Sequence, residues 1–208
     1  MITPLQRAIL VGSVLGDGGI YPQSTSSKHY WSKQSKAHFY FKQSEIYKDY
    51  VFWLYDQMKN LCPSIPKQRK DNGQWYFYTS PSEELMVLRN TFYSEDREKR
   101  IPHEIKHLLT NPISLAVWYM DDGSLDYRIK SHYNYALSTN CFSLAENKKL
   151  AEVLEKNFGI IASVQNPLCR GVRYPELYIG VAGRNNFIKT VKPHILPCFK
   201  KKIPPFEL

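Results

Sequence analysis

Cysteine is scarce in this chain of 208 residues, with four copies at positions 62, 141, 169 and 198. The four lie far apart and form no Cys-x-x-Cys pair, which argues against a structural zinc site. A disulfide framework is not expected in a chain of this size. We therefore expect the four cysteines to be buried free thiols.

Long hydrophobic runs are absent as well. No stretch of 18 apolar residues and no signal-peptide pattern occurs, so we expect a protein that is soluble and intracellular, with no membrane partner. A gene translated inside an organelle would need no targeting segment. The expected compartment is thus a mitochondrion or chloroplast if the gene lies there, and the cytoplasm otherwise.

Acidic residues are outnumbered, at 19 against 28 basic residues, which gives a net charge of +9. Residues 1–108 hold 15 basic and 11 acidic residues, and residues 109–208 hold 13 and 8, so the halves carry +4 and +5. A single charged tail would not produce this even distribution. The excess positive charge favours a polyanionic partner such as nucleic acid.

Two predicted helices start and end alike. The first opens with the capping-box pattern Thr3-Pro4-Leu5-Gln6 and the second with Asn111-Pro112, each with proline at the first helical position. Each apolar run then reaches an Asp-Gly pair, at residues 17–18 and 122–123. Both glycines suit the left-handed residue that ends many helices.

The segments after each Asp-Gly pair repeat in the same order. Strands are predicted at 36–44 and 133–139, amphipathic helices at about 45–60 and 144–158, and hairpins at 64–80, with a two-residue Asn72-Gly73 turn, and at 160–181. Further helices start near 81 and 184, and "KRIP" (99–102) is echoed by "KKIP" (201–204). We predict an α+β fold of two pseudo-symmetric αββαββα halves, 1–108 and 109–208, packed through their first helices.

A twofold axis between the halves would bring Asp17 and Asp122 together at two helix C-termini. Two carboxylates in that negative field are costly unless a cation lies between them. Mg²⁺, with Mn²⁺ as a substitute, suits carboxylate, water and phosphate oxygens. Alternatively, each Asp-Gly pair merely ends a helix, but two copies at matching positions favour the metal site.

The two motifs, "LVGSVLGDG" (10–18) and "LAVWYMDDG" (115–123), resemble those of the LAGLIDADG homing endonucleases. The likeness covers nearly the whole chain, as in the monomeric members of the family. The stretch "LTNPISLAVWYMDDGSLDY" resembles in particular the subgroup of the yeast mitochondrial omega-intron endonuclease. The resemblance implies that Asp17 and Asp122 are metal ligands and that the antiparallel sheets form a DNA-binding saddle.

The second motif departs from the family pattern. Where packed helices usually carry small residues, the first motif has Gly12 and Gly16 but the second has Val117 and Asp121. The closest approach of the helices should therefore depend on the first one. Asp121 becomes a rival to Asp122, and the backbone of Gly16 and of Asp121 could add metal ligands.

The resemblance also implies a lysine beside the active site near each Ile-Pro, here Lys99 and Lys202. Aligning "KRIP" with "KKIP" points to Lys201 instead, so the second half leaves two candidates. An ammonium there could stabilise developing charge, or orient or activate the attacking water. For Lys200 and Lys201 a solvated basic tail is an equally good interpretation.

Acidic residues are missing from 18–44, 127–145 and 160–175, which favours DNA-facing strands and loops. On a predicted strand at 65–71, Lys67 and Arg69 share one face. We predict that Tyr50, Trp53 and Leu54, at helical spacing, belong to the core. The predicted DNA contacts are Lys28, Lys33, Lys36, Lys42, Lys67, Arg69, Lys70, Arg128, Lys130, Arg170 and Arg173.

The resemblance implies a Mg²⁺-dependent endonuclease that cuts both strands of a long asymmetric DNA site and serves intron mobility. We expect each half to supply one acid to a two-metal displacement. One alternative is an RNA maturase that assists its host intron. The other is a non-cleaving DNA-binding regulator, for which loss of Asp17 or Asp122 would be expected; both acids are present.

Overall fold

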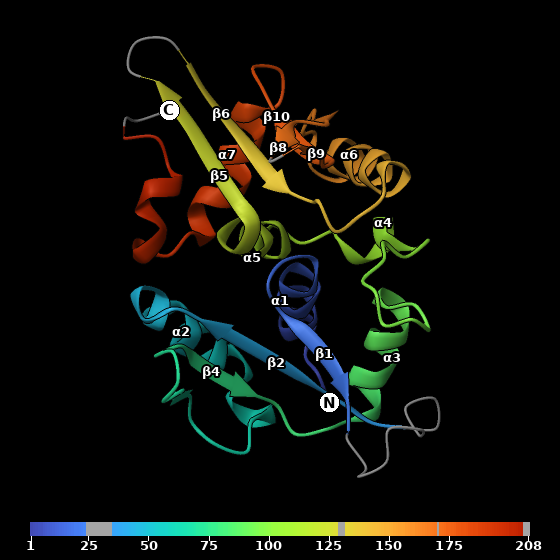
Figure 1. Cartoon of the computed structure of the whole chain (residues 1–208), viewed down its shortest axis with the longest axis vertical. Helices are drawn as coiled ribbons and strands as arrows, with labels where there is room; N and C mark the ends of the chain where they lie inside the picture. The colour runs from blue at the N-terminus through green and yellow to red at the C-terminus, as the bar shows by residue number, and fades with distance from the viewer. Residues whose placement is uncertain (24–34, 129–131, 170, 206–208) are drawn as a thin grey trace.

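The computed structural model describes residues 1–23, 35–128, 132–169 and 171–205 (Figure 1). The first half begins with a helix, and its elements are α1 (Pro4–Leu15), β1 (Gly19–Pro22), β2 (Ala37–Gln43), η2 (Glu45–Tyr47), α2 (Lys48–Met58), η3 (Lys59–Leu61), β3 (Lys67–Gln68), β4 (Trp75–Tyr78), α3 (Glu83–Phe92) and α4 (Ile105–Leu108). This order confirms the predicted αββαββα pattern for the first half.

The second half repeats the order. Its elements are α5 (Pro112–Asp122), β5 (Gly123–Arg128), β6 (His132–Ser138), α6 (Leu144–Phe158), β7 (Ser163–Gln165), β8 (Leu168–Cys169), β9 (Val172–Arg173), β10 (Glu176–Ile179), α7 (Arg184–Val191), η4 (Lys192–His194) and η5 (Pro197–Lys202). Within the hairpin predicted at 160–181, β7 pairs with β10, and the connection between them contains the small β8–β9 pair.

Two antiparallel four-stranded sheets have matching strand orders, β1-β2-β4-β3 and β5-β6-β10-β7. In each, the strand after the first helix pairs with the next strand, so that Gly19 lies opposite Tyr40 and Gly123 opposite Leu137. Figure 1 shows one sheet on each side of the α1–α5 pair. The predicted α+β fold of two similar halves is therefore confirmed.

Capping explains why the helices begin where they do. Thr3 and Ser143 each form a complete capping box, with Gln6 and Glu146 respectively. The Asn111 side chain accepts a hydrogen bond from the amide of Ile113 at 3.0 Å. Helix α6 runs over the predicted 144–158 because it has both this start signal and a left-handed Gly159 at its end.

The glycines after the two acids do not have the predicted left-handed conformation. Gly123 is extended, at φ −85° and ψ 155°, and Gly18 is not among the described residues with positive φ. Glycine is required at both positions because neighbouring atoms leave no room for a side chain. A Cβ on Gly123 would lie 1.9 Å from the Tyr119 ring, and one on Gly18 would lie 2.4 Å from Ser13 Oγ.

The predicted 65–71 strand was too long. Strand β3 holds only two residues, and Arg69 lies beyond it, hydrogen-bonded from its amide to the Gln74 carbonyl at 2.8 Å. The chain therefore turns through four residues, 70–73, in which Gly73 has φ +69°. The Asn-Gly signal located the turn, but the two-residue turn type was wrong.

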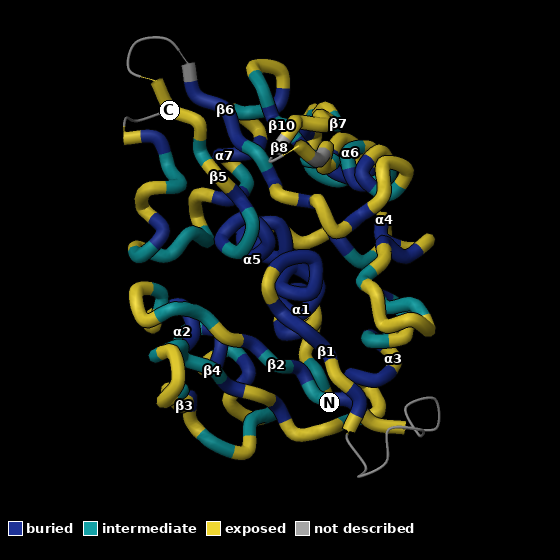
Figure 2. Tube along the Cα trace, viewed as in Figure 1, coloured by how far each residue is buried: buried dark blue, intermediate teal, exposed yellow. Residues whose placement is uncertain are grey.

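The two first helices form the centre of the molecule. Figure 2 shows α1 and α5 as its most continuously buried segments, and every residue from Ile113 to Met120 is buried. Both sheets cover this pair with aromatic and aliphatic side chains, including Phe39, Phe41 and Leu137. The apolar surface removed from water holds the two helices together along their length.

Each half sends a segment across to the other. The first strap (residues 99–109) donates from the Ile101 amide to Glu146 at 2.7 Å, and the Asn157 amide donates to the Leu109 carbonyl at 2.7 Å. The second strap (residues 197–203) places Phe199 against Tyr47, with ring centroids 4.7 Å apart and nearly parallel. The proposed boundary after residue 108 thus falls inside a segment that contacts both halves.

Two further sequence expectations concern the surface. The described helices include none that is long and apolar enough to cross a membrane. The cysteines expected to be buried are more accessible than that: Cys141 is exposed, and Cys62 and Cys198 are partly exposed. Nothing is described for the side chain of Cys169.

Candidate active site

The first helices approach each other most closely where the first one carries glycine. A Cβ on Gly12 would lie 2.2 Å from the Ser114 carbonyl oxygen, so no other residue fits without moving α5. Ser114 also donates from its hydroxyl to the Ala8 carbonyl at 2.7 Å, across the same interface. The expectation that close approach depends on the first helix is therefore met, and the helix ends with their acids are brought side by side.

Asp17 lies two residues beyond the end of α1 and is exposed. Its carboxylate accepts a hydrogen bond of 2.5 Å from the side-chain amide of Gln43, the last residue of β2. Its backbone amide donates to Asp121 on the opposite helix at 3.2 Å. Asp17 is therefore oriented by one group from its own half and one from the other.

Asp122 is the last residue of α5 and is partly buried. The pKa of its carboxyl is raised to about 6, first by burial and then by the nearby Asp17 carboxylate, while Lys99 and Lys202 act in the opposite direction. The structure thus brings four of the predicted residues, Asp17, Asp122, Lys99 and Lys202, into one electrostatic cluster.

Asp121 points into the helix interface. Its Oδ1 accepts from the Tyr50 hydroxyl at 2.7 Å, and its Oδ2 accepts from the Asp17 amide at 3.2 Å and from Ser13 Oγ at 3.4 Å. Burial and the Asp17 carboxylate raise its pKa well above the ordinary value. Both carboxylate oxygens of Asp121 are thus occupied by donors from the first half.

A lysine lies at the C-terminal end of each first helix. Lys99 donates from Nζ to the Gly16 carbonyl at 2.5 Å. Lys202 donates to the carbonyls of Met120 at 2.6 Å and Tyr119 at 3.0 Å, whereas Lys201 is exposed. Both cations interact favourably with the negative ends of the helix dipoles.

The two lysines are embedded rather than freely solvated. Burial lowers the pKa of Lys99 and of Lys202, and the neighbouring carboxylates partly offset that shift. Lys202 also lies 5.1 Å from the centre of the Phe199 ring. An ammonium held in this way is positioned near the acids without the entropy cost of ordering a long surface side chain.

The donors at the two helix ends fit a hard divalent cation. Asp17 lies close enough to Asp122 to raise the pKa of its carboxyl, which is the repulsion that a cation between them would relieve. The described residues include no set of three His, Cys, Asp or Glu side chains that could hold a metal by themselves. Water and substrate oxygens would have to complete the coordination, as Mg²⁺ usually requires.

Comparison with known proteins identifies the family. The family model described as the LAGLIDADG DNA endonuclease family matches residues 7–182. The chain belongs to the LAGLIDADG DNA endonuclease family. It is 25% identical over 218 residues to DNA endonuclease I-ChuI from Chlamydomonas applanata, which covers 97% of this chain and 95% of that protein.

Other relatives of this family member are not named as endonucleases. Cytochrome b mRNA maturase bI2 from Debaryomyces hansenii is 25% identical, over 96% of this chain and 75% of that protein. Protein RecA from Mycobacterium gastri is 26% identical over 99% of this chain, which spans only 48% of that protein. The chain thus matches nearly the whole length of one relative and only part of the length of others.

Solved structures have the same fold. The homing endonuclease I-WcaI, bound to its DNA recognition sequence, superposes with a TM-score of 0.80 at 24% identity, covering 100% of this chain and 89% of that one. I-DmoI in complex with DNA and Mn gives a TM-score of 0.54 at 19% identity, covering 91% and 97%. At these identities the likeness establishes the LAGLIDADG fold.

The predicted DNA contacts of this LAGLIDADG chain divide into three groups. Lys28, Lys33, Lys130 and Arg170 lie outside the described residues. Lys36, Lys42, Lys67 and Lys70 are exposed on or beside the strands of the first sheet. Arg69, Arg128 and Arg173 have local partners, namely Asp71 at 2.7 Å, Asp126 at 3.6 Å and the Asn166 carbonyl at 2.8 Å.

Three residues of the site were missed from the sequence. Gln43 and Ser13 gave no signal beyond being polar residues near a strand end and within a motif helix. Tyr50 was correctly predicted to be in the core, as were Leu54 and, in part, Trp53. Its hydroxyl nevertheless reaches Asp121 from a helix far away in the sequence. Helical spacing predicts which face is buried, but it does not reveal contacts between halves.

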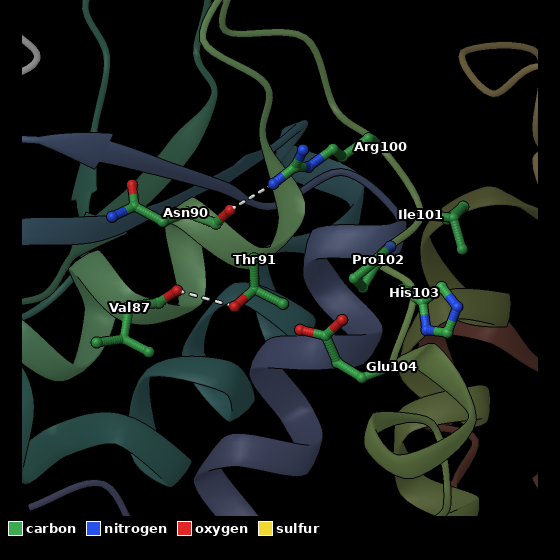
Figure 3. Close-up of a pocket in the computed structure, with 8 residues that line it drawn as sticks. All are labelled: Val87, Asn90, Thr91, Arg100, Ile101, Pro102, His103 and Glu104. Carbon is green, nitrogen blue, oxygen red and sulfur yellow. Dashed lines mark hydrogen bonds between the residues drawn. The ribbon is translucent and has the colours of Figure 1, made fainter.

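A separate hollow lies between α3 and the first strap (Figure 3). In Figure 3 Arg100 donates to the Asn90 carbonyl at 2.9 Å, within the wall of the hollow. Lys99, one residue earlier, reaches the Gly16 carbonyl instead. The hollow is lined by Val87, Asn90, Thr91, Arg100, Ile101, Pro102, His103 and Glu104, and it contains none of the four clustered residues.

Proposed function

We propose that this chain is a site-specific endonuclease that hydrolyses both strands of double-stranded DNA. The observation that carries the proposal is the pair of acids, Asp17 and Asp122, brought together at two helix ends with one embedded lysine beside each end. A purely structural helix end needs no second carboxylate next to the first. Membership of a DNA endonuclease family supports the same activity.

Asp17 and Asp122 are the proposed metal ligands, with Mg²⁺ as the cation and Mn²⁺ as a substitute. Such an ion would activate water and neutralise charge on a phosphodiester. Gly16 and Asp121 are kept only as secondary backbone ligands. The Gly16 carbonyl already accepts from Lys99, and the Asp121 side chain is occupied at both oxygens.

Lys99 and Lys202 are proposed to act on the scissile phosphate or on the attacking water. Each ammonium has donors left over after its carbonyl bonds, because an ammonium carries three. Burial, which lowers the pKa of each, strengthens their interaction with developing negative charge. Lys201 is exposed, so the proposal assigns the role in the second half to Lys202.

The proposed DNA surface is formed by the open faces of the two sheets. In β2 the burial alternates, with Phe39 and Phe41 in the core and Lys42 exposed, so one face of the strand is free. The basic residues predicted as contacts would bind mainly phosphates. The target is proposed to be long and asymmetric because the two sheets present different side chains.

The biological setting remains part of the proposal. We infer that the chain acts as a monomer in intron mobility, in an organelle if its gene lies there. A second function, assistance to splicing of the host intron RNA, is supported by the relationship to a cytochrome b mRNA maturase. Both activities are compatible with one fold.

A cleavage selection tests the proposed function. Purified protein and Mg²⁺ are mixed with a plasmid pool that includes the intronless host gene, and the new DNA ends are sequenced. Paired ends at one long site, absent with Asp17→Asn, would support the endonuclease. Binding without cleavage under Mg²⁺ or Mn²⁺ would contradict it, and acceleration of splicing of the host transcript would then support the maturase.

A further inference from the structure

Asp121 differs from the other acids in where its partners come from. It belongs to α5 of the second half, yet its three hydrogen-bond donors among the described residues, Tyr50, Asp17 and Ser13, belong to the first half. One of those donors is the backbone amide of a proposed metal ligand. Asp121 therefore holds the position of Asp17 from across the helix interface.

The matching position just after α1 cannot do the same. Gly16 precedes Asp17 as Asp121 precedes Asp122, and it has no side chain. A Cβ on Gly16 would lie 2.5 Å from Asp121 Cβ and 2.7 Å from its Oδ2. The Asp121 side chain thus fills the space that a side chain on Gly16 would need. Because one of the two matching positions has a large side chain and the other has none, the two half-sites are unequal.

Tyr50 fixes Asp121 in turn. Its side chain is fully buried, and its hydroxyl donates to Asp121 Oδ1 at 2.7 Å. Its ring packs edge-on against Phe41 at 5.4 Å and against Phe199 at 5.0 Å. Phe199 lies on the second strap, which also carries Lys202. Tyr50 therefore contacts Asp121, which binds the Asp17 amide, and the segment that carries the lysine of the second half-site.

We propose that Tyr50 and Asp121 are positioning residues that orient Asp17 across the helix interface. This inference rests on the proposed endonuclease function. Without the hydroxyl of Tyr50, Asp121 would lose its shortest hydrogen bond and its hold on the Asp17 amide would loosen. Asp122 has no such support, since none of the described side chains donates a hydrogen bond to it. The two strands of the DNA should then be cut at different rates.

The substitution Tyr50→Phe tests the proposal because it keeps the ring packing and removes only the hydroxyl. Tyr55→Phe is the matched control: Tyr55 lies on the same helix, is also buried, and packs on Phe77 at 6.1 Å within the first half. Both variants would be assayed at saturating protein with Mg²⁺ on a supercoiled plasmid carrying the recovered site, following nicked and linear DNA. DNA affinity without divalent cations and Tm are measured in parallel.

For Tyr50→Phe we expect linear DNA to form about tenfold more slowly than in the wild type, with nicked DNA accumulating. DNA affinity should stay within about threefold, whereas Tm should fall further than in Tyr55→Phe, because Tyr50→Phe leaves a carboxylate oxygen of Asp121 without its donor. Asp121→Asn should slow cleavage in the same way, and the double variant should be no slower than the slower single variant. Wild-type kinetics in Tyr50→Phe would overturn the proposal, as would slowing matched by weaker DNA binding.

Amide hydrogen exchange separates this inference from the proposed function, because it needs no cleavage. The Asp17 amide should exchange at least about fivefold faster in Asp121→Asn than in the wild type, with Tyr55→Phe unchanged. Equal exchange rates would overturn the positioning role even in an active enzyme. If the wild type cleaves no DNA but the exchange difference appears, the proposed function fails and the positioning of Asp17 stands.

Discussion

The two half-sites have the same fold around them and different surroundings at the acid. Asp17 is exposed and is held by hydrogen bonds, from Gln43 to its carboxylate and from its amide to Asp121. Asp122 is partly buried, and its carboxyl pKa is raised to about 6. One acid is oriented by partners, whereas the other is placed by the end of its helix.

Part of this difference arises from one position in the motif. Gly16 and Asp121 occupy matching places, and the larger residue fills the space left by the smaller. A repeated fold therefore does not ensure a repeated site, because the side chains that fill a shared interface must differ when they would otherwise collide. The chemistry of each half must accordingly be tested separately.

The largest effect is expected from the acids themselves. Asp17→Asn and Asp122→Asn should each reduce cleavage by about a thousandfold or more, because each removes a charge from the place where a cation and a phosphodiester would meet. DNA affinity should remain within a few fold. Single-turnover cleavage and a binding titration check this. Robust cleavage by either variant would remove that acid from the site.

Removal of a lysine should have an intermediate effect. Lys99→Ala and Lys202→Ala should each slow cleavage by about 10- to 100-fold, since the charge near the scissile phosphate is lost. Lys201→Ala, an exposed neighbour, is the matched control and should cleave at nearly the wild-type rate. A larger loss in Lys201→Ala than in Lys202→Ala would reverse the assignment for the second half.

Closer packing of the helices should reduce stability. Gly12→Ala places a methyl group 2.2 Å from a backbone carbonyl and should cost about 3 kcal/mol as the helices separate. The measurement is thermal unfolding, in which that cost corresponds to a Tm lowered by roughly 6–12 °C. Val117→Ala, at the matching position of α5, should cost less. An unchanged Tm in Gly12→Ala would show that the interface yields easily.

The smallest effect concerns the pH dependence of stability. The pKa of Asp122 is about 6 in the folded protein against an ordinary value of 3.8, so folding favours its protonated form. The associated stability is present below about pH 4 and is lost as pH rises through 6. Without divalent cations, Asp122→Asn should therefore be more stable than the wild type at pH 7.5, by up to about 2 kcal/mol.

The gain from Asp122→Asn should vanish near pH 4, where the wild-type carboxyl is already neutral. Thermal unfolding across pH 4–8 measures it. Asp56→Asn, at an exposed position of α2, is the control for removing a negative charge. A stability difference that is the same at pH 4 and pH 7.5 would contradict the raised pKa.

Local chemistry in the sequence predicted most of the fold. The helix predicted at about 144–158 matches α6, because the capping box at Ser143 acts within one helical turn. The repeat of Asp-Gly motifs predicted two similar halves and the helix pair between them. The shortness of β3 was not predictable, since its length depends on pairing with β4 rather than on its own residues.

The candidate site was predicted only as far as the motifs reach. Asp17 and Asp122 are visible in the sequence because their motifs repeat, whereas Lys99 and Lys202 were implied by the resemblance to the family. Tyr50 and Gln43 come from other elements and carry no local signal. Their roles depend on packing across tens of residues and between halves, which spacing alone does not encode.

The two straps have a consequence for recombining this chain with its relatives. The lysine beside each acid is carried on a segment that is seated partly on the opposite half, through Glu146 and Asn157 on one side and Tyr47 and Tyr50 on the other. A chimera joined after residue 108 would contain the first strap without the residues of the second half that it contacts. A segment that can be exchanged without loss of these contacts must include both the strap and the residues it packs against. Such a segment is larger than one repeat.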